Sequence, residues 1–339
     1  PPAVDALGDY TPVTMSATTE GCAMSGQTVA DVGEFGLIAA LQPRLRSTAA
    51  VEVPSGDDAA VLRLGGERLV VSTDMLVQDR HFRLEWSGPE DIGRKAAAQN
   101  FADLTAMGAR PVALTAAVAL PPQTQVDWVL GVVDGLVAEA AELGAAVVGG
   151  DVTRADVISI AVTALGVPSG SRLVSRAGAR PGDVVAVCGR LGWAAAGLAV
   201  LGRGFRSPRV VVDAHRRPHP PYSAGALAAA AGATAMIDVS DGLLSDLGHV
   251  AAASGVQIVL DPEALPVDDQ VKETASAFNA DPLGWVLTGG DDHALAATFP
   301  AGAALPAGFL AVGEVLEGSG VEVPGYRHVG LPGYDHFRE

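Results

Sequence analysis

The sequence is poor in aromatic residues and in cysteine. Aromatic residues make up 5% of the 339 positions and apolar residues 49%, so Ala, Val, Leu and Gly are expected to fill a closely packed interior. Two cysteines, Cys22 and Cys188, exclude a disulfide framework and are typical of reduced thiols in a cytoplasm. We therefore expect a globular, cytoplasmic protein.

Positive charge is also scarce. The formal net charge is −17, and the sequence has no run of basic residues and no platform of alternating aromatic and basic residues. A nucleic-acid binder needs clustered Lys and Arg, so DNA and RNA are excluded as main partners. The acidic excess has two interpretations, general solubility or a site that holds cations, and composition alone favours solubility.

Long hydrophobic runs are missing. The most apolar stretch, residues 184–201, contains Arg190 and is rich in Ala and Gly, so it is too short and too interrupted to span a bilayer. The N-terminus has neither the basic nor the apolar region of a signal peptide. No membrane partner is expected.

The length favours two domains. Residues 1–30 mix Pro, Ser, Thr and Gly without periodicity and are expected to form a mobile extension. The helical spacing of "VGEFGLIAAL" (32–41) predicts the start of the folded part. A Gly-, Ser-, Arg- and Pro-rich segment predicts a boundary between an N-terminal domain, 31–166, that binds metal and ATP and forms the dimer contact, and a C-terminal domain, 167–339.

Strand-like and helix-like patterns alternate along the chain, which predicts an α/β or α+β fold with mixed sheets covered by helices. The expected strands cover 68–73, 112–119, 145–148, 157–165, 183–188, a stretch ending at Ile237, 256–260, 285–288, 294–299 and 309–315. The expected helices cover 91–107, 125–143, a stretch from about 192, 223–231 and 242–253.

Six segments combine an apolar run, small residues and a carboxylate. Each aspartate has an ordinary explanation by itself, as a turn former or, near residue 240, as a helix cap. Asp103 is less easily explained, because it shares a helical face with Asn100 and Met107, and a carboxylate in apolar surroundings is costly unless it is paired or metal-bound. The carboxylates concerned are Asp57, Asp58, Asp74, Asp103, Asp151, Asp238, Asp241, Asp291 and Asp292.

These carboxylates cannot converge without compensation. Two unit charges about 4 Å apart cost roughly 4 kcal/mol at an effective dielectric constant of about 20. Either the pKa values rise or cations lie between the carboxylates, and an all-oxygen ligand set favours Mg²⁺. Because Mg²⁺ also binds substrate phosphates, the pattern indicates nucleotide phosphoryl transfer, although the sequence has no P-loop, no dinucleotide-binding motif and no protein-kinase catalytic loop.

Several motifs occur in the order found in the thiamine-monophosphate kinase family, which belongs to the aminoimidazole ribonucleotide synthase superfamily. They are GDD, STD with a following His-Phe, NFADLTAMGA, GGDVTR, SRAGARPGD, IDVSDGLLSDLGH and GGDDH. The chain resembles this family from about residue 32 to the C-terminal GYDHF, and its Ala- and Arg-rich style is typical of an actinobacterial member.

The resemblance implies phosphorylation of thiamine monophosphate to thiamine diphosphate by ATP, with several Mg²⁺ ions and with a role for K⁺ left open. It also implies a two-domain fold and a homodimer whose N-terminal sheets join. The implied metal ligands are Asp58, Ser72, Thr73, Asp74, Asp103, Asp151, Asp238 and Asp241. The implied ATP contacts are Asp58, Gly150, Asp151, Arg176 and Ser240, and the implied acceptor contacts are His81, Asp291 and Leu331.

Two positions depart from the family pattern. Asp291 stands where the family usually has Glu, one methylene longer, and Leu331 stands where it often has an aromatic residue that stacks on the substrate. Trp285 or Tyr334 is a candidate to supply the missing ring.

Two kinds of alternative remain. The chain could be a catalytically inactive metal- or nucleotide-binding member, or a related ATP-dependent synthase of the aminoimidazole ribonucleotide or selenophosphate type. Selenophosphate synthetases use a reactive residue near the N-terminus, and Cys22 lacks the Gly-rich context for that role. The C-terminal cysteine of hydrogenase maturation proteins is absent from the end of this chain, which reads GYDHFRE.

Overall fold

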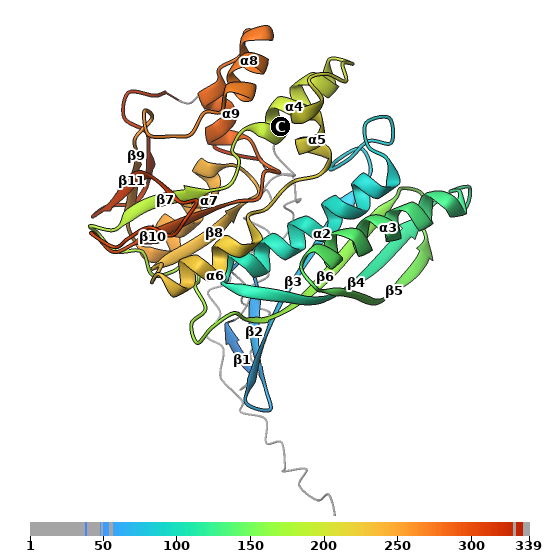
Figure 1. Ribbon diagram of the computed structural model, residues 1–339, viewed down its shortest axis with the longest axis horizontal. Coiled ribbons are helices and arrows are strands. Elements are labelled where there is room, and N and C mark those ends of the chain that lie inside the picture. The colour runs from blue at the N-terminus through green and yellow to red at the C-terminus, as the bar shows by residue number, and fades with distance from the viewer. Residues whose placement is uncertain (1–37, 39–47, 49, 54–56, 328–329, 335–339) are drawn as a thin grey trace, which may run out of the picture.

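The fold consists of two six-stranded sheets with helices packed against them (Figure 1). The chain is seen here in a computed structural model that describes residues 38, 48, 50–53, 57–327 and 330–334. The expected extension over 1–30, most of the expected helix over 32–41 and the last five residues lie outside the described residues.

The first half of the chain builds one sheet, in the order β1-β2-β3-β6-β4-β5, with only β4 and β5 parallel. Two helices cover one of its faces (Figure 1). The elements are β1 (Val51–Val53), β2 (Ala60–Leu64), β3 (Glu67–Val77), α2 (Pro89–Ala106), β4 (Ala109–Leu120), α3 (Val126–Glu142), β5 (Ala146–Arg154) and β6 (Ser159–Pro168).

The second half builds a sheet in the order β12-β9-β11-β7-β10-β8, with only β12 and β9 parallel. Its strands are β7 (Val184–Cys188), β8 (Ala235–Val239), β9 (Gln257–Leu260), β10 (Ala294–Phe299), β11 (Leu310–Leu316) and β12 (Gly320–Glu322). Its helices are α4 (Trp193–Gly202), α5 (Arg209–Arg216), α6 (Tyr222–Ala230), α7 (Leu243–Ser254), α8 (Asp269–Ala277) and α9 (Pro282–Thr288).

Helix α2 lies at the centre of the molecule. It packs against α3 and strands β3, β4 and β6 of the first half, and against α5, α6 and β8 of the second. Pro89 begins the helix, and the Asp91 carboxylate accepts a hydrogen bond of 3.0 Å from the Gly88 N–H. Small alanines along the helix let it lie close to elements on several sides, which is why even its polar residues are buried.

Several expected elements have different boundaries. The segment 285–288, expected as a strand, belongs to helix α9, which Asp281 caps by accepting from the Leu283 N–H. Its short apolar run is ambiguous between a strand and a buried helix, and Asp281 followed by Pro282 decides for the helix. Strand β3 continues past Asp74 to Val77, and β5 continues through the Gly-Gly-Asp motif, so these two motifs lie inside strands rather than at their ends.

Two helices were missed. Helix α5 begins after Pro208, in a segment for which the sequence predicts no helix, and α8 begins at the cap Asp268. Both are short amphipathic helices whose stability comes from packing on α4, so their own sequence carries little signal.

Helices α2 and α3 cross where two glycines face each other's backbone. A Cβ added to Gly135 would lie 2.2 Å from the Glu90 carbonyl oxygen, and one added to Gly93 would lie 2.0 Å from that of Val132. Only glycine fits at either position, and the close crossing fixes α2 relative to the first sheet.

We therefore expect Gly135→Ala to lower the thermal unfolding midpoint by several degrees, because the overpacked helix pair loses about 1–3 kcal/mol. The matched control is Gly248→Ala in α7, where an added Cβ meets nothing within 4 Å and alanine should leave stability unchanged or raise it. Equal midpoints for the two variants would contradict the proposed crossing.

Candidate active site

A cavity of about 960 Å³ lies between the two halves of the molecule. Its lining combines carboxylates, among them Asp58, Asp103 and Asp238, with apolar and aromatic side chains such as Phe82 and Trp285. A cavity of this composition can hold a polyanion through cations and an organic ring system through stacking and packing.

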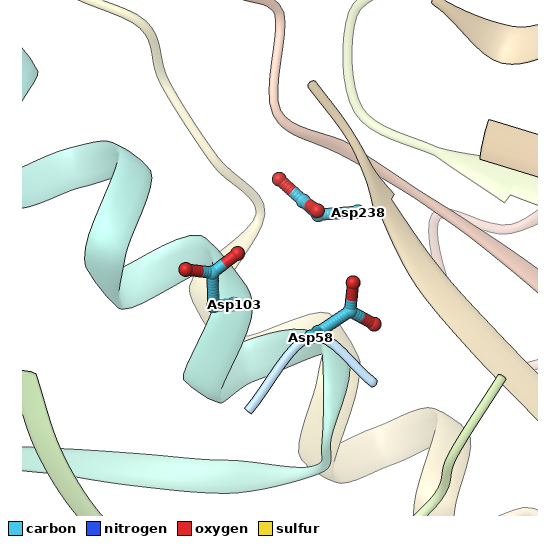
Figure 2. A group of neighbouring side chains, drawn as sticks. All are labelled: Asp58, Asp103 and Asp238. Atoms are coloured by element: carbon cyan, nitrogen blue, oxygen red, sulfur yellow. The ribbon is translucent and has the colours of Figure 1, made fainter. Parts of the chain in front are cut away.

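Three carboxylates from distant parts of the chain meet in this cavity (Figure 2). Asp58 precedes β2, Asp103 lies on α2 and Asp238 on β8, and each offers an oxygen such that the three oxygens lie within 4.8 Å of one another. Asp238 and Met236 lie on the same face of strand β8, and this face is directed toward helices α6 and α2. The convergence expected from the sequence is therefore found for these three residues.

Asp58 is 6% exposed and is held by Arg176. The guanidinium donates from Nε and Nη2 to the same oxygen, Oδ1, at 3.1 and 2.6 Å. The second oxygen, Oδ2, is buried and has no hydrogen-bond partner among the described residues. A buried carboxylate oxygen without a donor is costly, so it fits a site for a cation.

Burial and mutual repulsion disturb the ionisation of this cluster. Burial raises the pKa of Asp58 to about 8, against the opposing charge of Arg176. Burial, and then the charge of Asp74, raise the pKa of Asp103 well above its usual value. Asp58 and Asp103 therefore bind protons more readily than ordinary aspartates unless a cation takes the place of the protons, and the all-oxygen donor set of the cluster suits Mg²⁺.

Alternation along β3 separates the three residues of the Ser-Thr-Asp motif. Ser72 donates a hydrogen bond of 2.6 Å to Asp103, and the Asn100 side chain accepts one of 2.9 Å from the Asp74 N–H. The Thr73 hydroxyl instead donates to the Val162 carbonyl oxygen at 2.9 Å, on the opposite face of the sheet. The Ser72 side chain thus reaches the acidic cluster, whereas the Thr73 hydroxyl points away from it.

The loop after β8 completes the acidic part of the cavity. Ser240 and Asp241 line it, and the N–H groups of Asp241 and Gly242 donate to the buried carboxylate of Asp246 at 3.1 and 3.0 Å. Asp246 was not among the expected site residues. Burial, and then the charge of Asp241, raise its pKa well above the usual value.

The residues expected to contact the acceptor also line the cavity. His81 accepts a hydrogen bond of 2.8 Å from the Val77 N–H at Nδ1, which leaves the proton of a neutral ring on Nε2. Asp291 pairs with Lys95 at 2.7 Å, and that charge lowers the pKa of Asp291 to about 2 against the effect of burial. Leu331, Tyr334 and Trp285 are part of the same lining.

Two expected residues do not reach the cavity of their own chain. Gly150 and Asp151 lie on the exposed edge strand β5, and Asp151 is paired with Ala117 in β4. Ala117 in turn pairs with Ala161 in β6, and Ala161 pairs with Met75 in β3. Directly paired residues lie on the same face of a sheet, so Asp151 shares the face of Met75, which is opposite to that of Asp74. Three strand spacings of about 4.8 Å, roughly 14 Å in all, and the sheet itself separate Asp151 from the acidic cluster.

Lys95 and His293 were missed by the sequence interpretation. Lys95, in the middle of α2, is only 2% exposed, and His293 holds Asp238 through Nδ1 at 2.9 Å while its own Nε2 is buried without a partner among the described residues. Neither residue is part of the repeated pattern of carboxylates after apolar runs, so the sequence carries no such signal for them.

Comparison with known proteins identifies the family to which the chain belongs. Family models for AIR synthase related proteins match residues 56–168 (N-terminal domain) and 180–304 (C-terminal domain). A thiamine-monophosphate kinase of Mycobacterium tuberculosis is 46% identical over 327 residues, covering 96% of this chain and 98% of that protein. The chain belongs to the thiamine-monophosphate kinase family.

Two further relatives agree with this assignment. A thiamine-monophosphate kinase of Corynebacterium glutamicum is 45% identical over 301 residues, which cover 86% of this chain and 88% of that protein. The structure of AaThiL complexed with AMPPCP and TMP superposes with a TM-score of 0.83 at 32% identity, covering 90% of this chain and 97% of that one. The family resemblance and the fold class expected from the sequence are confirmed, and the Mycobacterium and Corynebacterium relatives fit an actinobacterial member.

The raised pKa values predict that stabilisation by Mg²⁺ depends on pH. A folded-state pKa above the unfolded value means that the neutral carboxyls stabilise the metal-free protein at low pH, and this stability is lost as pH rises from about 4 toward 8. Mg²⁺ needs the ionised carboxylates, so the increase in unfolding midpoint that it causes should grow between about pH 6 and pH 9.

The measurement is thermal unfolding with and without Mg²⁺ across this range, with Na⁺ at matched ionic strength as the control. A stabilisation by Mg²⁺ that stays constant or falls as pH rises would show that protons and Mg²⁺ do not compete for these groups.

Proposed function

We propose that this chain transfers the γ-phosphoryl group of ATP to the phosphate of thiamine monophosphate, giving thiamine diphosphate. The observation that carries the proposal is the convergence of Asp58, Asp103 and Asp238, with an unpartnered buried oxygen, in a cavity large enough for both substrates. Membership of the thiamine-monophosphate kinase family names the acceptor, and the relative complexed with AMPPCP and TMP supports this pair of ligands.

The chemistry requires little from protein side chains beyond positioning. The nucleophile is a phosphate oxygen that is already ionised near neutral pH, so no general base is needed. The obstacle is repulsion between two anionic phosphates. Asp58, Asp103 and Asp238, with Ser72, Asp74 and Asp241 around them, would hold Mg²⁺, which supplies charge neutralisation and in-line alignment when bound.

Charged and polar side chains around this cluster position the two substrates. Arg176, which holds Asp58, can turn its guanidinium to fork onto an ATP phosphate, and Ser240 lines the same cavity. His81 offers Nε2–H to the acceptor phosphate, and Asp291 attracts the cationic thiazolium ring. Leu331 replaces the usual aromatic contact, and Trp285 supplies an aromatic face in the same lining.

An assay with purified protein, ATP, thiamine monophosphate and Mg²⁺ tests the activity, and Asp103→Asn tests the metal assignment. We expect thiamine diphosphate to form in the wild type and to fall by about two to three orders of magnitude in the variant, which loses a ligand charge. Asp103→Asn should stay folded, with a metal-free unfolding midpoint at or above that of the wild type, because the neutral amide avoids the burial and repulsion that disfavour an ionised Asp103.

Tight ATP binding by the wild type without turnover would instead identify an inactive member of the family. Near wild-type turnover in Asp103→Asn would remove that residue from the metal site while leaving the activity itself in place.

We further propose that the chain acts as a homodimer in which Gly150 and Asp151 enter the site of the partner subunit. Asp151 lies on the sheet face that no described helix covers, together with half-buried apolar residues such as Val71 and Leu165. An uncovered, largely apolar sheet face and an open edge strand favour association with a second sheet. Within one chain the sheet separates Asp151 from the acidic cluster. If the sheets of two chains join, the partner's Asp151 would come close to the acidic cluster of this chain.

Subunit mixing tests this arrangement. Asp151→Asn and Asp103→Asn chains are each expected to be inactive, but co-expression should restore about a quarter of wild-type activity, because half of the dimers are mixed and each of these has one intact site. Co-expression without recovery would contradict a contribution from the partner subunit, and a monomeric mass in solution would exclude the dimer.

The cytoplasmic location and a role for K⁺ stay predictions. Among the described residues, no helix is both long and apolar enough to cross a membrane.

A further inference from the structure

Lys95 is a buried cation at the junction of the two halves. The chain contains only two lysines, Lys95 and Lys272, among 22 basic residues. Lys272 is exposed on α8, whereas Lys95 is 2% exposed. In a chain that uses arginine almost everywhere, a buried lysine marks a place where a compact ammonium with three donors is required.

Its hydrogen bonds go to two loops, one after strand β3 of the first sheet and one between helix α9 and strand β10 of the second half. The Lys95 ammonium donates to the Asp291 carboxylate at 2.7 Å and to the His81 carbonyl oxygen at 3.1 Å. Both residues are among those that the proposed function assigns to the acceptor substrate. One buried cation therefore joins the acceptor contact from the first half of the chain to that from the second.

The backbone around Asp291 is already held by other contacts. The Asp291 N–H donates to the Ser240 carbonyl oxygen at 2.8 Å, and Asp292 accepts from the Ala194 N–H at 2.8 Å. Asp291 itself has a left-handed backbone, with φ of 67°. With the backbone fixed in this way, Lys95 is the charged partner that decides where the short Asp291 side chain, which stays 36% exposed, presents its carboxylate.

The position along α2 separates this pair from the acidic cluster. Lys95 lies eight residues before Asp103, which is about 12 Å along the helix axis. Two positions on one rigid helix thus carry the acceptor-side cation and a carboxylate of the metal cluster, so Lys95 can affect the acceptor without touching the ATP side.

We propose that Lys95 is a positioning residue for the acceptor: it holds the Asp291 carboxylate in place beside the His81 loop, and through Asp291 it sets the affinity for the acceptor but not for ATP. This inference rests on the proposed function. It also accounts for aspartate at position 291, because a side chain one methylene longer would have to bend away from the ammonium to occupy the same place.

The test compares steady-state kinetics of wild type, Lys95→Met, Asp291→Asn and the double variant, with Lys272→Met as a control for loss of an exposed lysine. For Lys95→Met we expect the acceptor KM to rise on the order of ten- to a hundredfold, because Asp291 loses its partner. The KM for ATP and the affinity for Mg²⁺ should stay within about twofold, since the acidic cluster is untouched. Lys272→Met should match the wild type.

The double variant shows whether Lys95 acts by positioning Asp291, by contacting the acceptor directly, or only by stabilising the fold. If Lys95 acts through Asp291, adding Lys95→Met to Asp291→Asn should change the acceptor KM by less than about threefold. If Lys95→Met alone does not fold, the comparison of the double variant with Asp291→Asn still decides the case, because the double variant has lost both charges of the pair. An acceptor KM that is unchanged in folded Lys95→Met, or that rises in parallel with the KM for ATP, would overturn the proposal.

The wild-type assay comes first and keeps the two hypotheses apart. A wild type that makes no thiamine diphosphate contradicts the proposed function. In that case calorimetry decides the role of Lys95: it compares the affinity for thiamine monophosphate of the wild type with that of Lys95→Met, with AMPPCP present. Equal acceptor affinities, or none in the wild type, would overturn it.

Discussion

Repulsion among three carboxylates held within 4.8 Å is the constraint on which the site depends. Asp58, Asp103 and Asp238 come from a loop, a helix and a strand that are each fixed by packing elsewhere, so the residues cannot move apart to relieve the repulsion. Arg176 offsets part of the charge but occupies only one oxygen of Asp58. The fold therefore stores an electrostatic imbalance that protons relieve in the free protein and that hard cations relieve when bound.

Helix α2 makes this arrangement possible because it packs on both sheets. Its alanines and the glycine crossing with α3 keep its backbone close to its neighbours, and a rigid helix holds its polar residues at fixed spacings. Lys95 and Asp103 consequently face different parts of one cavity from one element. The same rigidity that stabilises the core sets the separation between the acceptor side and the metal side of the site.

The departures from the family pattern have a structural context. Asp291 is short, but it meets a buried ammonium on a backbone held from both sides. Leu331 supplies no aromatic ring, but Trp285 and Tyr334 line the same cavity. Asp151 lies on the far face of its own sheet, which makes its expected role dependent on a second chain. These features modify how the substrates are held without altering the acidic cluster.

The sequence by itself determined the order of most helices and strands, the family and the acidic residues, because periodicity and linked motifs are local signals. It misjudged residues 285–288 and the ends of β3 and β5, and it missed α5 and α8, because short apolar or amphipathic segments take their conformation from what packs on them. Only the tertiary structure decided that Asp58, Asp103 and Asp238 meet, that Asp151 does not join them within one chain, and that Lys95 is buried. Burial and proximity depend on distant segments, and no local pattern encodes them.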